Sequence, residues 1–430
     1  MKLVFLKQKM IYPRDNMIKT LLSMSLSAVV LAAGLTASAH AADAPIRVGF
    51  LTIKSGALAA GGKQMEDGLR LFLKERNNTI AGRKVELFVG DTAGQPAIAK
   101  TKAQELVEKD KVQVIIGPLA AFEALAIDDY TRKAEVPVIS PSAAAEDLTQ
   151  RKPNPWFVRA VGTSAQTSHV LGDYAARDLK YKRIAIIADD FAFGHETASG
   201  FQRAFEDAGG KVVQKLWSPL NVADYGTYIG QIKPNVDAVF AAFAGGNGIK
   251  FLKQYNEYGM KAKIPVLGSM TTVDEGILKS MGDEALGVIS TGWYAAGIDN
   301  PDNKRFVQSM NRDYQQDPGY YSMGAYGAAL MLEQALKDVK GKIEDKAGFM
   351  AALRQVQLSN DPRGKFSLDA LGNPVMDIYV RKVERKNGKL ANSVVKTYPA
   401  VSQFWTYSKK DFLANPVYTR DYPPAVNIEK

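Results

Sequence analysis

The chain has no cysteine among its 430 residues, and this absence removes several classes of protein at once. Disulfide frameworks, thiolate metal sites and thiol nucleophiles are excluded, so the fold must be held by its core alone. Histidine is almost as scarce, with three residues and no pair at metal-ligand spacing. We therefore expect neither a metal site nor a cofactor.

Catalytic fingerprints are missing as well. The sequence contains no Gly-x-Ser-x-Gly elbow, no P-loop and no Gly-x-Gly-x-x-Gly after its first predicted strand. The glycine-rich run 55–62 follows that strand but lacks the Lys-Ser/Thr ending of a phosphate loop, which favours a turn that positions a ligand. These absences indicate a protein that is not an enzyme.

The N-terminus has the layout of a secretory signal. Lys19 precedes an apolar stretch at 21–35, small residues follow at 39–41, and cleavage is expected after Ala41. A membrane anchor is the alternative, but an apolar core of about 15 residues falls short of the roughly 20 that span a bilayer. The lack of cysteine excludes a lipoprotein. We therefore expect export to the periplasm, with the signal peptide 1–41 removed.

The charge pattern gives no sign of a nucleic-acid partner. Lys and Arg number 55 against 45 Asp and Glu, and without residues 1–41, which hold five basic residues and one acidic, the net charge falls from +10 to +6. Basic and acidic residues are interspersed, with no run of like charge. The length predicts two domains or more.

From residue 46 the sequence alternates short β-branched runs with amphipathic stretches, the pattern of βαβ units around a parallel sheet. The predicted strands are 46–52, 84–89, 112–116, 137–140, 183–188, 211–216, 238–243, 265–267, 288–292 and 377–383. The predicted helices are 62–76, 96–109, 165–179, 195–208, 248–259 and 302–315. Continuous apolar runs such as 184–187 indicate sheets covered on both faces. In such sheets ligands bind beyond the carboxyl ends of the strands.

An ordered set of short motifs resembles the leucine/isoleucine/valine-binding protein family. The motifs run from about residue 46 to 390 and are Ile46-Arg47-Val48-Gly49-Phe50, Ser55-Gly56, Gly117-Pro118, Val138-Ile139-Ser140-Pro141-Ser142, Arg183-Ile184-Ala185-Ile186-Ile187 and Phe193-Gly194. No single motif is diagnostic, and the specificity lies in their order and spacing. The resemblance implies an α/β chain with the type I periplasmic-binding fold, in which two doubly wound parallel-sheet lobes are joined by a three-crossing hinge.

The resemblance also implies where the chain divides. Crossings are expected near Arg159, Gly292 and Leu368. The predicted segments are 42–159 plus 292–368 for the N-terminal lobe, 160–291 plus 369–410 for the C-terminal lobe, and 411–430 for a C-terminal tail. Closure would then be a hinge motion that the ligand stabilises by touching both lobes.

In this family the ligand's carboxylate is held at two helix starts, where the helix dipole places positive partial charge. The corresponding places are 119–123 and 142–145, and the family's hydroxyl residues align with Ala121 and Ala144. Both side-chain donors are therefore missing. The residues left around the anion are Ser55, Phe122, Ser142, Ala143 and Ala144, with backbone amides as the main donors.

Amino-acid-binding members of the family hold the ligand's ammonium with an acidic residue and an aromatic hydroxyl. Those positions correspond to Met270 and Ala244. A buried ammonium without its carboxylate partner costs about 3 to 5 kcal/mol, which is at least two powers of ten in affinity. A plain amino acid is therefore a poor ligand, unless the alignment is shifted and Asp274, Glu275 or Asp190 supplies the charge.

In place of those polar contacts to the ammonium, the sequence offers apolar, flat or small residues. They are Phe122, Phe193, Phe243, Met270, Tyr294 and Tyr321, with Gly61 where the family often has a bulky aromatic residue. A single aromatic residue is more often core than ligand contact, but the joint placement of this set after strands favours a planar apolar ligand with a terminal carboxylate. The family's receptors for benzoate-type and phenylpropenoate-type acids resemble this pattern.

Three further positions complete the predicted ligand site. His195, at a helix start, hydrogen-bonds a carboxylate or phenol, or is an ordinary first-turn residue. Thr271 reaches the ligand's distal polar group, or joins Thr272 in capping the helix that follows. Gly245 follows Ala244 after the strand 238–243.

The sequence therefore predicts the periplasmic substrate-binding subunit of an ABC-type importer, a monomer that binds a small aromatic carboxylate and passes it to a membrane permease. No nucleic-acid partner, cofactor or metal is expected. Two alternatives remain open: a receptor of the same fold for branched-chain amino acids or small amides, and a ligand sensor that signals through a partner.

Overall fold

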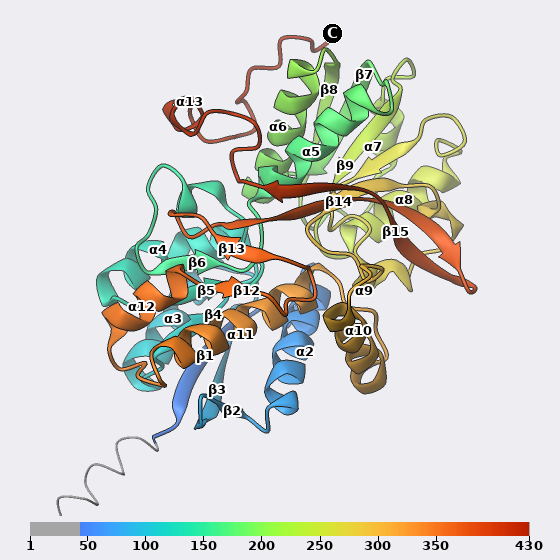
Figure 1. Cartoon of the computed structure of the whole chain (residues 1–430). Helices are drawn as coiled ribbons and strands as arrows, with labels where there is room; N and C mark the ends of the chain where they lie inside the picture. The colour runs from blue at the N-terminus through green and yellow to red at the C-terminus, as the bar shows by residue number, and fades with distance from the viewer. Residues whose placement is uncertain (1–43, 430) are drawn as a thin grey trace, which may run out of the picture. The chain divides into compact units, whose positions relative to one another are not determined.

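The computed structural model describes residues 44–429, so the predicted signal segment lies outside the described residues. The compact unit that begins at Ile46 contains two mainly parallel β-sheets with helices packed around them (Figure 1). Within residues 44–429, no helix combines the length and the apolar character that a bilayer crossing requires.

The first sheet has six strands in the order β2-β3-β1-β4-β5-β6. Its strands are β1 (Ile46–Thr52), β2 (Thr79–Ile80), β3 (Arg83–Asp91), β4 (Val114–Ile116), β5 (Val138–Ser140) and β6 (Phe157–Arg159). All pairs are parallel except the β2–β3 hairpin. The associated helices are α2 (Ala59–Glu75), α3 (Pro96–Gln104), α4 (Ala121–Ala134), α11 (Tyr320–Asp338) and α12 (Lys346–Arg354). The strand order reverses between β1 and β4, which is where such sheets place a ligand.

The second sheet has nine strands in the order β12-β13-β14-β11-β10-β9-β7-β8, with β15 paired to β14. Its strands are β7 (Arg183–Asp189), β8 (Lys211–Ser218), β9 (Ala238–Ala242), β10 (Val266–Gly268), β11 (Ile289–Gly292), β12 (Gln357–Leu358), β13 (Phe366–Leu368), β14 (Pro374–Lys386) and β15 (Lys389–Val401). The helices along this part are α5 (Ser164–Arg177), α6 (Ala192–Asp207), α7 (Gly226–Gln231), α8 (Asn247–Glu257), α9 (Glu275–Leu278) and α10 (Pro301–Tyr314). β7 to β11 are parallel, and here the order reverses between β7 and β9.

Burial along the strands explains the layered arrangement. β4 and β9 are buried at every residue, and β7 at every residue after Arg183. A strand with both faces buried needs helices on each side, and the apolar runs of the sequence predicted this. Every predicted strand and helix is present with ends shifted by a few residues, which confirms that part of the analysis.

Several observed helices are not among those predicted, and α11 is the longest of them; its burial explains why the helical pattern does not reveal it. Nearly all of its residues from Tyr320 to Leu336 are buried, so the helix lacks the polar stripe that an amphipathic pattern requires. The strands β12 and β13 fall in the predicted stretch 292–368 but belong to the second sheet, where β12 pairs with β13 and β13 pairs with β14. The boundaries of the lobes stay a prediction.

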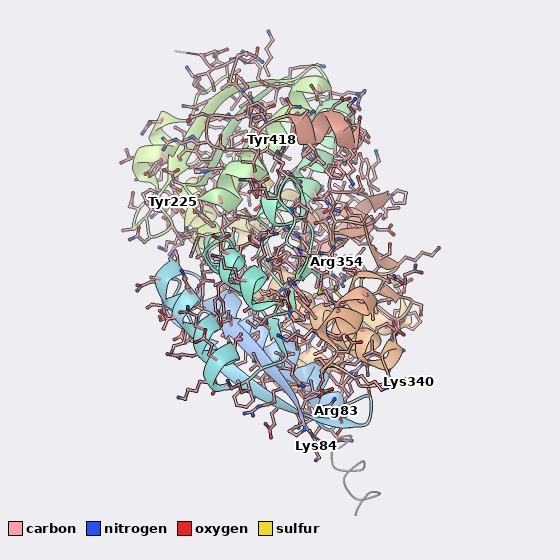
Figure 2. The ribbon with its side chains drawn as sticks, turned by 90° about the vertical axis from the view of Figure 1, so that its left-hand side faces the viewer. Arg83, Lys84, Tyr225, Lys340, Arg354 and Tyr418 are labelled. Atoms are coloured by element: carbon pink, nitrogen blue, oxygen red, sulfur yellow. The ribbon has the colours of Figure 1, made fainter. Side chains whose placement is uncertain are left out.

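The C-terminal segment packs against α5 and α6. Tyr418, labelled in Figure 2, brings its hydroxyl to 3.0 Å from Nε2 of His169. Arg203 on α6 stacks 3.8 Å above the ring of Tyr407, and Arg151 donates through Nε to the carbonyl of Asn415. Burial lowers the pKa of His169 to about 3. This histidine is therefore a neutral packing residue rather than a ligand or a base.

Candidate functional site

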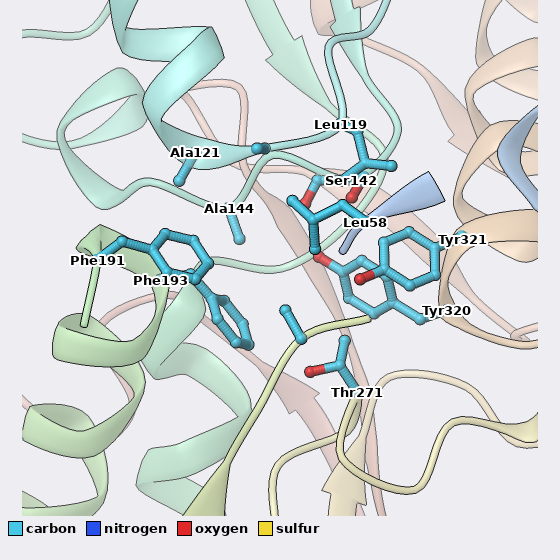
Figure 3. A pocket seen from close by; sticks show the side chains of 12 residues that line it. Leu58, Leu119, Ala121, Ser142, Ala144, Phe191, Phe193, Thr271, Tyr320 and Tyr321 are labelled. Atoms are coloured by element: carbon cyan, nitrogen blue, oxygen red, sulfur yellow. The ribbon is translucent and has the colours of Figure 1, made fainter. Parts of the chain in front are cut away.

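A hollow lies where the carboxyl ends of strands from both sheets meet (Figure 3). Its empty volume is about 330 Å³, including the part open to solvent. We call it the first pocket, and its lining is Leu58, Leu119, Ala120, Ala121, Ser142, Ala144, Phe191, Phe193, Ala244, Thr271, Tyr320 and Tyr321. None of these twelve side chains is an acid, a lysine, an arginine or a histidine, so the pocket has no formal charge.

The start of α4 supplies the main polar feature of the first pocket. Ala120 is the N-cap, with φ −96° and ψ 149°, and its N–H donates to Oε2 of Glu123 at 3.0 Å. The other carboxyl oxygen of Glu123 accepts from the hydroxyl of Thr92. Burial raises the pKa of Glu123, which the hydrogen bonds of Thr92 and Ala120 oppose. The amides of Ala121 and Phe122 are left without intrahelical acceptors at the positive end of the helix, where they can bind an anion.

The second predicted helix start differs from expectation. After β5 the chain forms only a 3-10 turn, Glu146–Thr149, and residues 142–145 are not helical. One cause is local, because the Ser140 hydroxyl donates to the Ala143 carbonyl at 3.0 Å and holds a turn there. Ser142 still lines the first pocket, and its carbonyl accepts from the Tyr320 hydroxyl at 2.6 Å. Of the two predicted helix starts, only the start of α4 is a helix N-terminus in the structure.

Two pairs of aromatic rings flank the first pocket, as Figure 3 shows. Phe191 and Phe193 lie at the start of α6 with ring centroids 5.9 Å apart. Tyr320 and Tyr321 lie at the start of α11 with centroids 5.0 Å apart. Phe122 is not part of the lining, and packs edge-on against Phe191 at 5.7 Å. The rings offer flat apolar surfaces to a small planar ligand.

Gly61 explains the position of one of these rings. A Cβ atom at Gly61 would stand 2.9 Å from Cζ of Tyr321, so the ring occupies the space that a side chain on α2 would fill. The Tyr321 hydroxyl accepts from the Gly245 N–H, and burial raises the pKa of Tyr321. The glycine on α2 and the tyrosine on α11 therefore form one wall together.

Two acidic residues near the first pocket, Asp189 and Asp274, already accept hydrogen bonds from other groups of the protein. Asp189 accepts from the Ala244 N–H and from the Asn247 side chain, each at 2.8 Å, and burial raises its pKa to about 7. Asp274 accepts from the N–H groups of Tyr320 and Gly276, and burial, followed by the charge of Glu275, raises its pKa to about 7.

The two other candidate acids are paired with cations. Glu275 forms a buried ion pair with Arg381 at 3.2 Å. Asp190 bonds Nε2 of His195 at 2.7 Å and Nη1 of Arg420 at 3.2 Å. An ammonium in the first pocket would therefore meet no carboxylate among the lining residues.

The structure brings seven of the thirteen predicted site residues together in the first pocket. They are Ala121, Ser142, Ala144, Phe193, Ala244, Thr271 and Tyr321. Met270 lines an adjacent hollow, which we call the second pocket. The remaining five, which line neither pocket, are Ser55, Phe122, Ala143, His195 and Gly245.

Several of the predicted residues have other roles in the structure. Ser55 is exposed, and His195 packs edge-on against Trp217 at 4.9 Å. Thr271 and Thr272 do not cap the following helix, because Asp274 is the N-cap of α9. Phe243 packs in the core of the second sheet, and the Tyr294 hydroxyl donates to Asn303 at 2.8 Å.

Five lining residues are not among the thirteen predicted individually, namely Leu58, Leu119, Ala120, Phe191 and Tyr320, although the predicted ligand-positioning segments 55–62 and 119–123 contain the first three. Four of them follow β1, β4 or β7 within the loops that the strand pattern predicts. Tyr320 has no such signal, because it reaches the pocket from α11, which the sequence pattern does not reveal.

Comparisons with known proteins show what the chain is similar to. The family model described as periplasmic binding protein matches residues 45–389. A Leu/Ile/Val-binding protein homologue from Brucella melitensis is 29% identical over 372 residues, which are 85% of this chain and 94% of that protein.

Solved structures of solute-binding proteins are also similar to this chain. A solute-binding protein of an ABC transporter from Rhodopseudomonas palustris BisB5, in complex with 3,4-dihydroxybenzoic acid, is 34% identical with a TM-score of 0.80, covering 84% of this chain and 98% of that one. A second, from Rhodopseudomonas palustris HaA2 in complex with p-hydroxybenzoic acid, is 30% identical with a TM-score of 0.79, covering 84% and 99%.

Proposed function

Because the chain belongs to the periplasmic binding protein family and has the type I fold of that family, we propose that it is the solute-binding subunit of an ABC-type importer for a small aromatic carboxylate. The ligand lies in the first pocket, with its ring between the phenylalanine and tyrosine pairs. Its carboxylate faces the amides at the start of α4 and the hydroxyl of Ser142.

The observation that carries this proposal is the pairing of an uncharged aromatic lining with one helix start. Phe191, Phe193, Tyr320 and Tyr321 provide the apolar surface, and Ala121 begins α4 at the wall of the same pocket. An anion gains from the helix dipole and the free amides, while the ring is buried. The solved relatives in complex with dihydroxybenzoic and hydroxybenzoic acids support this ligand class.

A receptor for branched-chain amino acids is the second candidate, because the curated relatives carry that name. The lining argues against it. The positions that hold the ammonium in such receptors are Ala244 and Met270 here, and Asp189 and Asp274 are bonded to backbone amides. An amino acid would then leave its ammonium unpaired, at a cost of about 3 to 5 kcal/mol.

The remaining expectations belong to the same proposal. The protein acts in the periplasm after removal of residues 1–41, as a monomer with no catalytic activity, and delivers its ligand to a permease. Its lobes are 42–159 with 292–368 and 160–291 with 369–410, and the ligand closes them by touching both. A ligand sensor would differ from a transport protein only in the partner that binds the closed form.

Thermal unfolding of the mature protein with a panel of acids tests the proposed function. The panel contains benzoate and phenylpropenoate, with leucine, valine and benzamide as comparisons. A ligand at 100 times its Kd stabilises by about 2.7 kcal/mol, which gives a clear rise in Tm. We expect a rise with the aromatic acids alone. A rise with leucine or valine alone would assign the pocket to amino acids.

Replacing Gly61 with alanine tests the wall formed with Tyr321. The added Cβ atom forces the tyrosine ring to move, because its nearest contact is the end of a side chain rather than backbone. We expect roughly fivefold to tenfold weaker binding of an aromatic acid in titration calorimetry, with a small change in Tm. Gly230→Ala on α7, where no atom lies within 4 Å of the new Cβ, is the matched control. Equal affinities in the two variants would show that the ring does not contact the ligand.

A further inference from the structure

The longest described helix, α11, begins without a side-chain cap of its own. Its N-cap residue is Gly319, which has no side chain to accept a hydrogen bond from the first turn. The acceptor comes instead from Asp274, whose Oδ1 accepts from the Tyr320 N–H. A carboxyl group at this position also interacts favourably with the positive end of the helix dipole. The start of α11, which carries Tyr320 and Tyr321 to the wall of the first pocket (Figure 3), therefore depends on a residue far away in the sequence.

Asp274 belongs to the part of the chain that is built on the second sheet. It follows β10 and is the N-cap of α9, where its Oδ2 accepts from the Gly276 N–H at 3.1 Å. In contrast, α11 packs against α2, β4 and β5 of the part built on the first sheet. One carboxyl group therefore caps two helices, one from each part, and joins the two parts beside the first pocket.

The approach of Asp274 to the start of α11 leaves no room for a side chain at Gly319. A Cβ atom at Gly319 would stand 2.3 Å from Oδ1 and 2.4 Å from Oδ2 of Asp274. Gly319 has φ −131° and ψ −157°, an extended conformation that alanine also adopts. The glycine is therefore required by the approach of Asp274 and not by its own backbone conformation.

Two further contacts join the same two parts of the fold. A Cβ atom at Gly276 on α9 would stand 2.2 Å from Oε1 of Gln64 on α2, and both Gln64 and Asp274 are buried. The Tyr321 hydroxyl accepts from the N–H of Gly245, which follows β9. These contacts connect protein to protein and form only when the two parts lie this close, which we call the closed arrangement.

We infer that Asp274 is a positioning residue for ligand binding, which holds the closed arrangement together by capping α11 from the second sheet. The inference rests on the proposed function and adds the group that sets how long a ligand stays bound. Opening of the site breaks the bond between Asp274 and the Tyr320 N–H, whereas the bond to Gly276 lies within one part and persists. A contact made only in the closed arrangement slows ligand release and leaves the encounter of the ligand with the open site unchanged.

Stopped-flow measurements of tryptophan fluorescence test this role in the mature protein, because the Trp293 ring lies 5.1 Å from that of Tyr320 between centroids. In Asp274→Asn one carbonyl oxygen replaces two carboxyl oxygens, so the side chain still caps α9 but no longer serves both N–H groups. We expect this variant to release benzoate or phenylpropenoate about fivefold to tenfold faster, with an association rate within about twofold of wild type. The Tm without ligand should change little. Asp345→Asn is the matched control, since Asp345 caps its own helix α12 through the Gly348 N–H at 3.0 Å.

Gly319→Ala tests the same contact from the other side and leaves both caps chemically intact. The added methyl group meets the Asp274 carboxyl only in the closed arrangement, so we expect about tenfold faster release with little change in the association rate or in the Tm without ligand. Gly348→Ala is the matched control, because its Cβ atom would stand 2.3 Å from Oδ2 of Asp345 within a single helix. This variant also serves if Asp274→Asn does not fold.

Leucine enters the same measurements, so that failure of the inference and failure of the proposed function can be told apart. Release rates equal to wild type in both Asp274→Asn and Gly319→Ala would overturn the inference and leave the proposed function intact. A loss of affinity carried by the association rate, or an equal loss in the two controls, would assign Asp274 to packing and also overturn the inference. Binding of leucine alone would overturn the proposed ligand, and the release rates of leucine would then decide the role of Asp274. Absence of binding by every compound would overturn both.

Discussion

Replacing Ala121 with proline is expected to weaken the binding of an aromatic carboxylate by about 10- to 100-fold. Ala121 is the first residue of α4, a position where proline fits a helix and removes only a free N–H. The preceding residue, Ala120, already has the extended backbone that a following proline requires. A hydrogen bond to a charged group contributes about 1.5 to 3 kcal/mol, which sets the expected loss.

Titration calorimetry measures this loss, and two comparisons isolate its cause. Ala121→Gly keeps the N–H and removes the methyl group, so we expect its affinity to stay within about threefold of wild type. The Tm without ligand should change little in either variant, because Ala120 keeps its bond to Glu123. Unchanged affinity in Ala121→Pro would mean that this amide does not hold the carboxylate.

The second prediction concerns a buried group of ionisable side chains that follow strands of the first sheet and lie on α6. Glu146 follows β5, Glu196 lies on α6 and Arg159 ends β6, and all three side chains are buried. The Glu146 N–H donates to Oε1 of Glu196 at 3.2 Å, and Nη2 of Arg159 donates to Thr149 at 2.8 Å. Both carboxyl oxygens of Glu146 and two nitrogens of Arg159 have no hydrogen-bond partner among the described residues.

Two buried carboxyl groups beside one guanidinium favour retention of one proton. Burial, and then the charge of Glu196, raises the pKa of Glu146. Burial raises the pKa of Glu196 to about 7, against the Ser164 hydrogen bond and the Arg159 charge. A carboxyl whose pKa is raised by folding stabilises the folded state least at high pH. Its contribution is complete below the unfolded value near 4.5 and is lost as pH rises through about 7.

Glu196→Gln should therefore stabilise the protein at pH 8 by roughly 1 to 3 kcal/mol relative to its effect at pH 4.5, because it removes a buried carboxyl whose pKa is raised and also the charge that raises the pKa of Glu146. Urea unfolding of both proteins from pH 4.5 to 8 measures the difference. His169, Asp189 and Asp274 titrate in both proteins and cancel from it. Parallel stability curves would show that folding does not raise the pKa of Glu196.

Glu66→Gln is a control for which we expect a change in stability of the opposite sign at pH 8. Burial raises the pKa of Glu66, but Arg70 and Lys54 outweigh this effect and lower it overall. Its charge is therefore stabilising at neutral pH, and its loss should destabilise the protein slightly at pH 8 and not at pH 4. The two variants together separate a raised carboxyl pKa from a general effect of removing a glutamate.

The binding site is partly predictable from local sequence patterns, because its residues follow strands. Ala121, Ser142, Phe193 and Ala244 come soon after apolar strand patterns, and parallel strands bring their carboxyl ends to one edge. Local patterns do not tell which of two nearby rings faces the pocket. Phe191, the extended N-cap of α6, lines it, and Phe122 packs behind that ring.

By itself the sequence determined the α/β class and the positions of the parallel strands, because each of these depends on neighbours within a few residues along the chain. Only the tertiary structure decided the contacts between distant segments. The pairs Gly61 with Tyr321 and Glu146 with Glu196 join residues on separate elements, and no local pattern encodes how those elements pack.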